Sequence, residues 1–244
     1  MARFLLVHGS FHGPWCWERF APLLEAAGHQ VTAVALPTAP AEADLAGYAA
    51  SVTSVIDGIA EPVILVGHSM GGIVSAQVSE LRHDRLLAVV YVNGLLLRNG
   101  ESLAGFLADN AHLDVDDLVL KNMQVSEDGA TARFPAEKAP EVFYGSCTDE
   151  AAQWASVRLG EQRTKVYGDP LRLTPERFGR VRRFYVRGLR DMAVSLAYQD
   201  VMLANTPCEA TFDIDGDHSP FLSAPAELAA ALTAVAAATE KLAA

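Results

Sequence analysis

The fold is decided by the segment Pro62-Val63-Ile64-Leu65-Val66-Gly67-His68-Ser69-Met70-Gly71-Gly72. Its first half is apolar and largely β-branched, which is typical of a strand buried on both faces. Its second half contains a G-x-S-x-G motif, and the apolar spacing from Ile73 to Leu81 predicts a helix after it. Strand, tight turn and helix form the context in which this motif exposes a nucleophilic serine. We therefore predict that Ser69 lies on a strained turn at the carboxyl end of a sheet and acts as a nucleophile.

The composition favours a globular α/β protein without a nucleic-acid or membrane partner. The chain has 244 residues, of which 50% are hydrophobic and 20% are charged, and this is enough for one large domain with its own core. A net charge of -11 argues against binding to nucleic acid or to an anionic membrane surface. The three cysteines are widely spaced and predict neither a disulfide framework nor a metal site. We see no signal peptide or membrane span, and we expect a soluble, cytoplasmic protein.

Outside the central segment, apolar runs alternate with helical periodicity. This alternation predicts an α/β fold with a doubly wound, mostly parallel six-stranded sheet and the site at its carboxyl edge. The strands are expected at 3–8, 30–36, 62–66, 86–92, 181–189 and 209–214.

The alternation disappears between residues 95 and 179, where acidic and polar patches and scattered aromatic residues replace it. A free-standing domain of this length would need a denser apolar pattern. We therefore expect residues 1–94 and 180–244 to form the core and residues 95–179 to form an inserted cap or lid.

Three predicted strand ends carry a serine, an acid and a histidine in the order Ser69, Asp191, His218, which is the order of an α/β-hydrolase. Serine is a poor nucleophile at neutral pH, so His218 would accept its proton while an acid orients the imidazole. Asp191 is the predicted acid, because it follows the neighbouring strand. The alternative for Asp191 is a surface ion pair with Arg187 or Arg190. Rival acids on the strand and turn of His218 are Asp213, Asp215 and Asp217.

The glycine-rich turn after the first strand lacks the spacing of a nucleotide-binding loop. We expect the backbone N–H of Ser10, together with that of Met70, to form an oxyanion hole. Residues expected at the substrate, with plain packing as the alternative, are Phe11, His12, Phe143, Tyr144 and Trp154. His12 could instead support the oxyanion loop.

The chain resembles the plant-type methylesterase and hydroxynitrile lyase branch of the α/β-hydrolases, which also has bacterial members. The resemblance covers nearly the whole chain and is carried by residues 5–17, 22–29, 67–72, 141–144 and 216–218. It implies a Ser-His-Asp triad, no cofactor, a mobile cap, frequent homodimers and small carboxylic esters as substrates.

The residues that directly follow two of the histidines separate the esterases of this branch from the lyases. Lyases of the family typically carry threonine after the first histidine and lysine after the catalytic one, whereas this chain has Gly9 and Ser219. We therefore predict a serine esterase that hydrolyses a small, largely apolar carboxylic ester through an acyl-enzyme on Ser69. The alternatives are a lyase or a lactone or C–C bond hydrolase on the same triad, and a small-ligand binding protein without turnover.

Overall fold

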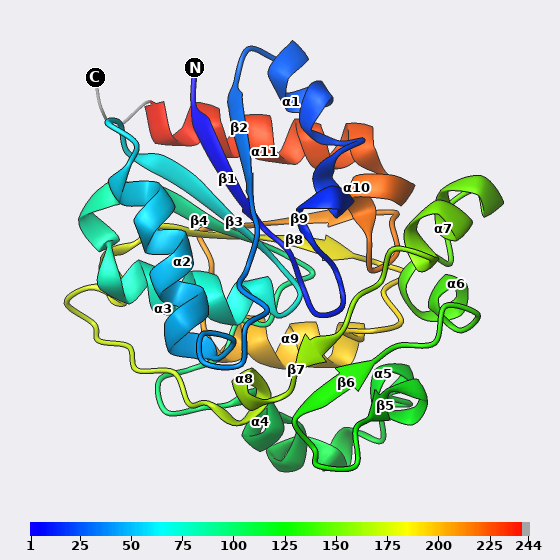
Figure 1. The fold of residues 1–244 in the computed structure, drawn as a ribbon. Helices are drawn as coiled ribbons and strands as arrows, with labels where there is room; N and C mark the ends of the chain where they lie inside the picture. The colour runs from blue at the N-terminus through cyan, green and yellow to red at the C-terminus, as the bar shows by residue number, and fades with distance from the viewer. Residues whose placement is uncertain (241–244) are drawn as a thin grey trace.

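A computed structural model describes residues 1–240 and contains a central six-stranded sheet with the strand order β2-β1-β3-β4-β8-β9 (Figure 1). Every adjacent pair in this sheet is parallel. The order steps outward from β1 in both directions, which is the doubly wound arrangement predicted from the sequence. All six predicted strands are present. Their bounds are β1 (Arg3–Val7), β2 (Gln30–Val34), β3 (Val63–His68), β4 (Leu86–Val92), β8 (Arg183–Gly188) and β9 (Ala210–Ile214).

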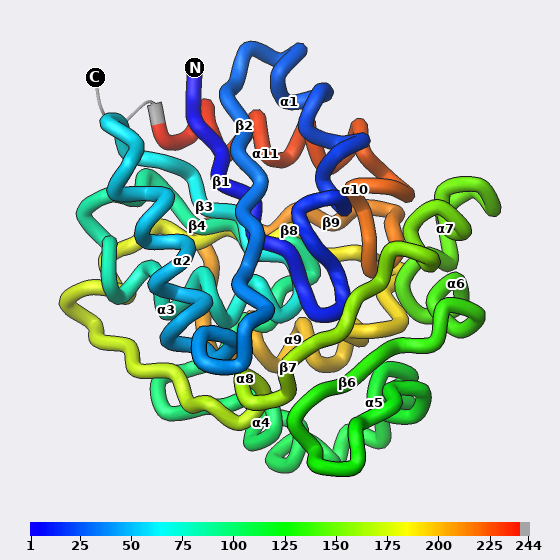
Figure 2. The backbone as a smooth tube through the Cα atoms, viewed as in Figure 1, coloured from blue at the N-terminus to red at the C-terminus, as the bar shows by residue number. Residues whose placement is uncertain are grey.

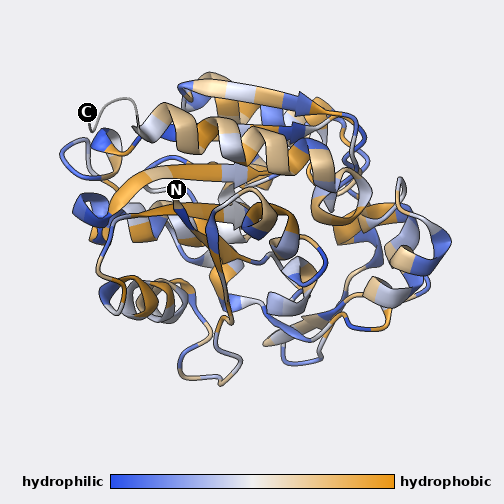
Figure 3. Ribbon diagram, turned by 90° about the horizontal axis from the view of Figure 1, so that it is seen from above, coloured by the Kyte–Doolittle hydropathy of each residue, from blue (hydrophilic) through white to orange (hydrophobic). Residues whose placement is uncertain are grey.

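Helices cover both faces of the sheet, because successive strand side chains point to opposite sides. Leu5 and Leu65 pack with α2 (Leu45–Asp57), α3 (Gly71–Leu81) and α9 (Leu196–Asn205) on one face. On the other face, Leu6 and Val66 pack with Trp17 and Phe20, which follow β1, and with the last helix, α11 (Pro225–Glu240). Figure 3 shows this sheet as a largely hydrophobic layer between helices.

The chain between β1 and β2 forms two short helical elements. The remaining elements of the core are η1 (Pro14–Trp17), α1 (Ala21–Ala26), η2 (His83–Arg85), η4 (Phe178–Arg180), α10 (Pro220–Ser223) and α11 (Pro225–Glu240). Within residues 1–240, no helix is both long and apolar enough to cross a membrane.

The chain between β4 and β8 forms short elements, many of which lie beyond the carboxyl ends of the strands (Figure 2). A small antiparallel sheet of order β5-β6-β7 runs through it. Its elements are α4 (Leu103–Asp109), η3 (Ala111–Leu113), α5 (Leu118–Asn122), β5 (Gln124–Val125), β6 (Thr131–Arg133), α6 (Ala139–Phe143), α7 (Asp149–Ser156), β7 (Gln162–Arg163) and α8 (Lys165–Gly168).

Candidate active site

Ser69 lies on a strained turn between β3 and α3. Its φ is +53°, a left-handed conformation that non-glycine residues rarely adopt. The glycines of the motif make this turn possible, since a Cβ on Gly67 would stand 2.5 Å from the Gly71 carbonyl oxygen and one on Gly71 would stand 2.6 Å from that of Val7. Strand, turn and helix are thus present as the G-x-S-x-G motif predicts.

The side chains of His218 and Asp191 are paired in the core. Nδ1 of His218 lies 3.0 Å from both carboxylate oxygens of Asp191, and both side chains are almost fully buried. Asp191 Oδ1 also accepts the backbone N–H groups of Ala193 and Val194, each at 2.8 Å. A carboxylate held in this way selects the tautomer in which Nδ1 carries the proton, which leaves Nε2 as an acceptor.

The rival acids have other partners. Arg187 forms ion pairs with Asp200 and Asp213, and Arg190 pairs with Asp215. The alternative that Asp191 forms a surface ion pair with Arg187 or Arg190 is therefore wrong, because both arginines pair with other acids and Asp191 contacts His218. Rival Asp217 instead accepts the backbone N–H of Ser219 and the Ser223 hydroxyl, so it fixes the turn that carries His218.

Sequence reasoning missed Asn93, the buried residue directly after β4. Its side-chain amide donates to the carbonyl oxygens of Asp217 at 2.8 Å and His218 at 3.2 Å, and its Oδ1 accepts the N–H of Gly188 at 2.6 Å. Its φ is +46°, a region that asparagine tolerates better than most residues. The only sequence signal was an asparagine directly after a predicted strand, which does not by itself indicate these contacts.

Two neutral histidines support the loop after β1. His8 Nδ1 lies 2.9 Å from the Gly9 carbonyl oxygen, and its Nε2 accepts the N–H of Leu36. His12 Nδ1 lies 2.8 Å from the Ser10 carbonyl oxygen, and its Nε2 lies 2.8 Å from the Tyr144 hydroxyl. Burial lowers the pKa of His8 to about 4 and that of His12 to about 3, so both are neutral near pH 7.

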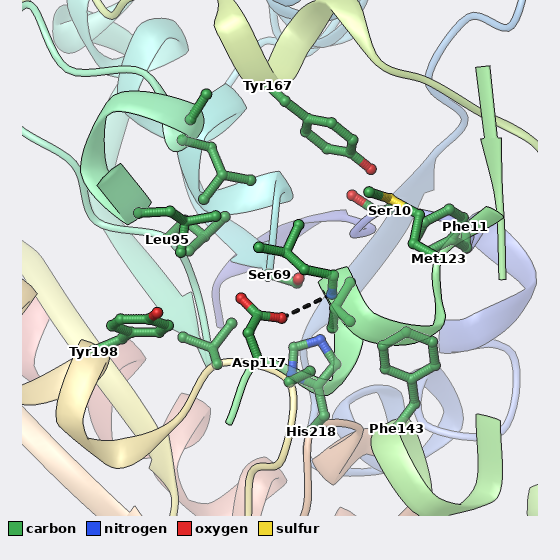
Figure 4. A pocket seen from close by; sticks show the side chains of 17 residues that line it. Ser10, Phe11, Ser69, Leu95, Asp117, Met123, Phe143, Tyr167, Tyr198 and His218 are labelled. Atoms are coloured by element: carbon green, nitrogen blue, oxygen red, sulfur yellow. Dashed lines mark hydrogen bonds between the residues drawn. The ribbon is translucent and has the colours of Figure 1, made fainter. Parts of the chain in front are cut away.

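Ser69 and His218 line the same pocket, which has a volume of about 400 Å³ (Figure 4). Most of its lining is apolar and comes from the core and from the chain between β4 and β8. Its lining residues are Ser10, Phe11, Ser69, Leu95, Leu103, Ala104, Leu107, Asp117, Val119, Leu120, Met123, Phe143, Tyr167, Ala193, Val194, Tyr198 and His218.

Two of the five expected substrate residues, Phe11 and Phe143, line this pocket, and the other three do not. His12 and Tyr144 are hydrogen-bonded to each other behind the loop of Ser10. Trp154 packs edge-on against Trp15, with the guanidinium groups of two arginines over its ring. The structure thus does not bring these three side chains into the pocket lining, and local packing occupies them.

The sequence also did not single out Asp117, which contributes a carboxylate to the largely apolar lining. Asp117 precedes α5, and its Oδ1 accepts the N–H of Leu120 at 2.9 Å as an N-cap. Burial raises the pKa of this carboxyl, with the neighbouring charge of Asp116 adding to the effect. Within residues 1–240, no group of three or more His, Cys, Asp or Glu residues is arranged to hold a metal ion.

The chain belongs to the alpha/beta hydrolase family, whose model matches residues 4–231. It is similar to putative methylesterase 13 of Arabidopsis thaliana, with 28% identity over 93% of this chain and 54% of that protein. It is also similar to an alpha-hydroxynitrile lyase of the same plant, with 28% identity over 96% of both chains. These matches confirm the resemblance to the methylesterase and hydroxynitrile lyase branch. The chain spans about half the length of the chloroplastic methylesterases that it matches.

The solved structures support the fold. A pyrethroid hydrolase from Sphingobium faniae JZ-2 superimposes with a TM-score of 0.85 at 24% identity, over 98% of this chain and 99% of that one. At this level of identity the match establishes the α/β-hydrolase fold, and the chemistry must be argued from the site itself.

Proposed function

We propose that the protein is a serine esterase that hydrolyses a small, largely apolar carboxylic ester through an acyl-enzyme on Ser69. The observation that carries this proposal is the buried Asp191–His218 pair, whose imidazole shares a pocket with a serine held at positive φ. A binding protein without turnover would have no use for such strain or for a fixed tautomer.

Each residue has a role in the proposed reaction. His218 Nε2 accepts the hydroxyl proton of Ser69 as its oxygen attacks the ester carbonyl, and then donates that proton to the departing alcohol. Asp191 stabilises the imidazolium formed in between. Water, activated by the same imidazole, releases the acid from Ser69.

Two backbone groups are proposed to stabilise the oxyanion. Among residues 1–240, none accepts a hydrogen bond from the backbone N–H of Ser10 or of Met70. Both groups flank the nucleophile, since Met70 follows it and Ser10 lines its pocket. Such a donor contributes about 3 kcal/mol to stabilisation of the transition state.

The pocket supports an ester rather than a cyanohydrin as substrate. Its lining within the described chain contains no lysine or arginine that could stabilise a departing cyanide. Ser219, where lyases carry lysine, is fully buried and absent from the lining. The names of the related methylesterases and of the pyrethroid hydrolase agree with ester hydrolysis. We further propose that residues 95–179 act as a cap, because they supply one wall of the pocket.

Hydrolysis of activated esters tests the proposal. We expect the wild type to release p-nitrophenol from p-nitrophenyl butanoate and hexanoate, and Ser69→Ala to lower the rate by about 10⁴- to 10⁶-fold. Ser54→Ala, at an exposed serine of α2, is the matched control and should leave the rate unchanged. A folded wild type without turnover, or an active Ser69→Ala variant, would refute the esterase.

A further inference from the structure

Among residues 1–240, one acidic side chain lines the pocket, and the proposed reaction does not use it. The carboxylate of Asp117 lies in a wall formed mainly by leucine, valine, methionine and aromatic side chains (Figure 4). In the described part of the chain, no lysine or arginine pairs with it: Lys121, the nearest cation in sequence, pairs with Asp116. A partly buried carboxylate without a cation is costly, so a partner supplied by the substrate would offset that cost.

The position of this carboxylate is fixed by the local backbone. Its Oδ1 accepts the N–H of Leu120 at the start of α5, which orients the side chain toward the pocket that Ser69 and His218 also line. An ionised carboxylate offers about four acceptor sites and no donor. It can therefore bind a hydroxyl or an ammonium group of a ligand while it caps the helix, and it repels another carboxylate.

From this geometry we propose that Asp117 determines substrate specificity: the ester hydrolysed at Ser69 carries a hydrogen-bond donor, a hydroxyl or a protonated amine, on its otherwise apolar body. This inference rests on the proposed esterase activity and names the substrate class within it. It also implies that esters with a second, anionic carboxylate are poor substrates, since that group would face Asp117 across an apolar pocket.

The test compares p-nitrophenyl esters of equal length that differ at the far end of the acyl chain. The heptanoate ends in methyl, the ω-hydroxyhexanoate in hydroxyl, the ω-aminohexanoate in ammonium and the adipate monoester in carboxylate. For each polar ester, kcat/KM is divided by the value for the heptanoate. This ratio cancels changes that affect the chemistry of all four esters equally.

Asp117→Asn keeps an N-cap acceptor for α5 and removes the charge. We expect it to lower the ratio for the hydroxyl and ammonium esters about ten- to a hundredfold, because a charged acceptor is lost, and to raise the ratio for the carboxylate ester. Asp116→Asn, at the adjacent exposed acid, is the matched control and should leave all ratios unchanged. If Asp117→Asn does not fold, Asp117→Ser, which can also cap the helix, replaces it.

The outcomes separate this inference from the proposed function. Hydrolysis of all four esters at ratios that Asp117→Asn leaves unchanged would overturn the specificity role and leave the esterase intact. The inference would also fail if Asp116→Asn changed the ratios as much, since the effect would then come from charge in general. No hydrolysis of any ester by the folded wild type would refute the esterase itself.

Discussion

The side chain of Asn93 holds the loop of His218 in place: its amide nitrogen lies 3.2 Å from the His218 carbonyl oxygen. The oxygen of the same side-chain amide, Oδ1, accepts the N–H of Gly188, at the end of the strand that leads to Asp191. One buried side chain therefore connects the loop of the proposed base to the strand of the proposed acid. His68 adds a second contact, with its Nε2 2.8 Å from the same carbonyl oxygen.

Replacement of Asn93 should affect catalysis more than substrate binding. Asn93→Ala leaves the buried N–H of Gly188 unpaired, which should lower the free energy of unfolding by about 1–3 kcal/mol. The loss of alignment between His218 and Asp191 should lower kcat about ten- to a hundredfold with little change in KM. Chemical denaturation and steady-state kinetics on a p-nitrophenyl ester measure the two effects.

Two further variants separate the causes. Asn93→Gly tolerates the positive φ but lacks the amide, so it should reproduce the kinetic defect. Asn205→Ala, at an exposed asparagine of α9, should change neither quantity. Full activity of Asn93→Gly would show that the hydrogen bonds do not position His218.

The position of Gly9 should not accept the threonine that lyases of the family carry. A Cβ at Gly9 would stand 2.7 Å from the Cβ of Ser69 and 3.0 Å from Nδ1 of His68, so one of these side chains must move. Gly9→Ala should therefore lower kcat/KM for an activated ester by about 10²-fold, the usual cost of a displacement near 1 Å. Gly168→Ala, where an added Cβ meets nothing within 4 Å, is the control. An unchanged Gly9→Ala enzyme would contradict the tight approach of the two loops.

The buried histidines should make the protein less stable in mild acid. The pKa of His12 falls from 6.5 to about 3 on folding because of burial, so the unfolded chain binds the proton first as the pH drops. The free energy of unfolding should be constant above about pH 6.5 and fall below it, by about 1.4 kcal/mol per pH unit for each such group. The measurement is urea denaturation between pH 7 and pH 5.

Substitution at His12 should reduce this dependence. The glutamine of the His12→Gln variant cannot titrate. The free energy of unfolding of this variant should therefore fall less steeply with decreasing pH, by about 1.4 kcal/mol per pH unit. His112→Gln, at an exposed histidine, should retain the slope of the wild type. Equal slopes for His12→Gln and the wild type would mean that His12 is not held neutral in the folded state.

The sequence was sufficient for the fold and for the order of the site residues. Apolar runs such as Val63–Val66 identify strands buried on both faces, and the glycines at 67 and 71 identify the turn. Asp191 could be preferred over Asp217 because it follows a neighbouring strand, and its contact with His218 agrees with that preference. The catalytic roles of these residues remain predictions.

The residues that line the pocket could not be predicted in the same way. Outside segments with a regular apolar period, the direction in which a side chain points depends on tertiary packing. Trp154 was expected at the substrate, but cation–π contacts with Arg19 and Arg158 engage its ring. Asp117 was passed over within an acidic stretch, since nothing in the sequence distinguishes the acid that faces the pocket from Asp116 beside it.

The central claim, that Ser69 is an activated nucleophile, is tested most directly by a fluorophosphonate and intact-mass measurement. We predict one adduct on the wild type, mapped to Ser69, and none on Ser69→Ala. Asp191→Asn should be labelled more slowly by about 10⁴-fold, because the imidazole then adopts the wrong tautomer. No adduct on the folded wild type, or an adduct that persists in Ser69→Ala, would contradict the account.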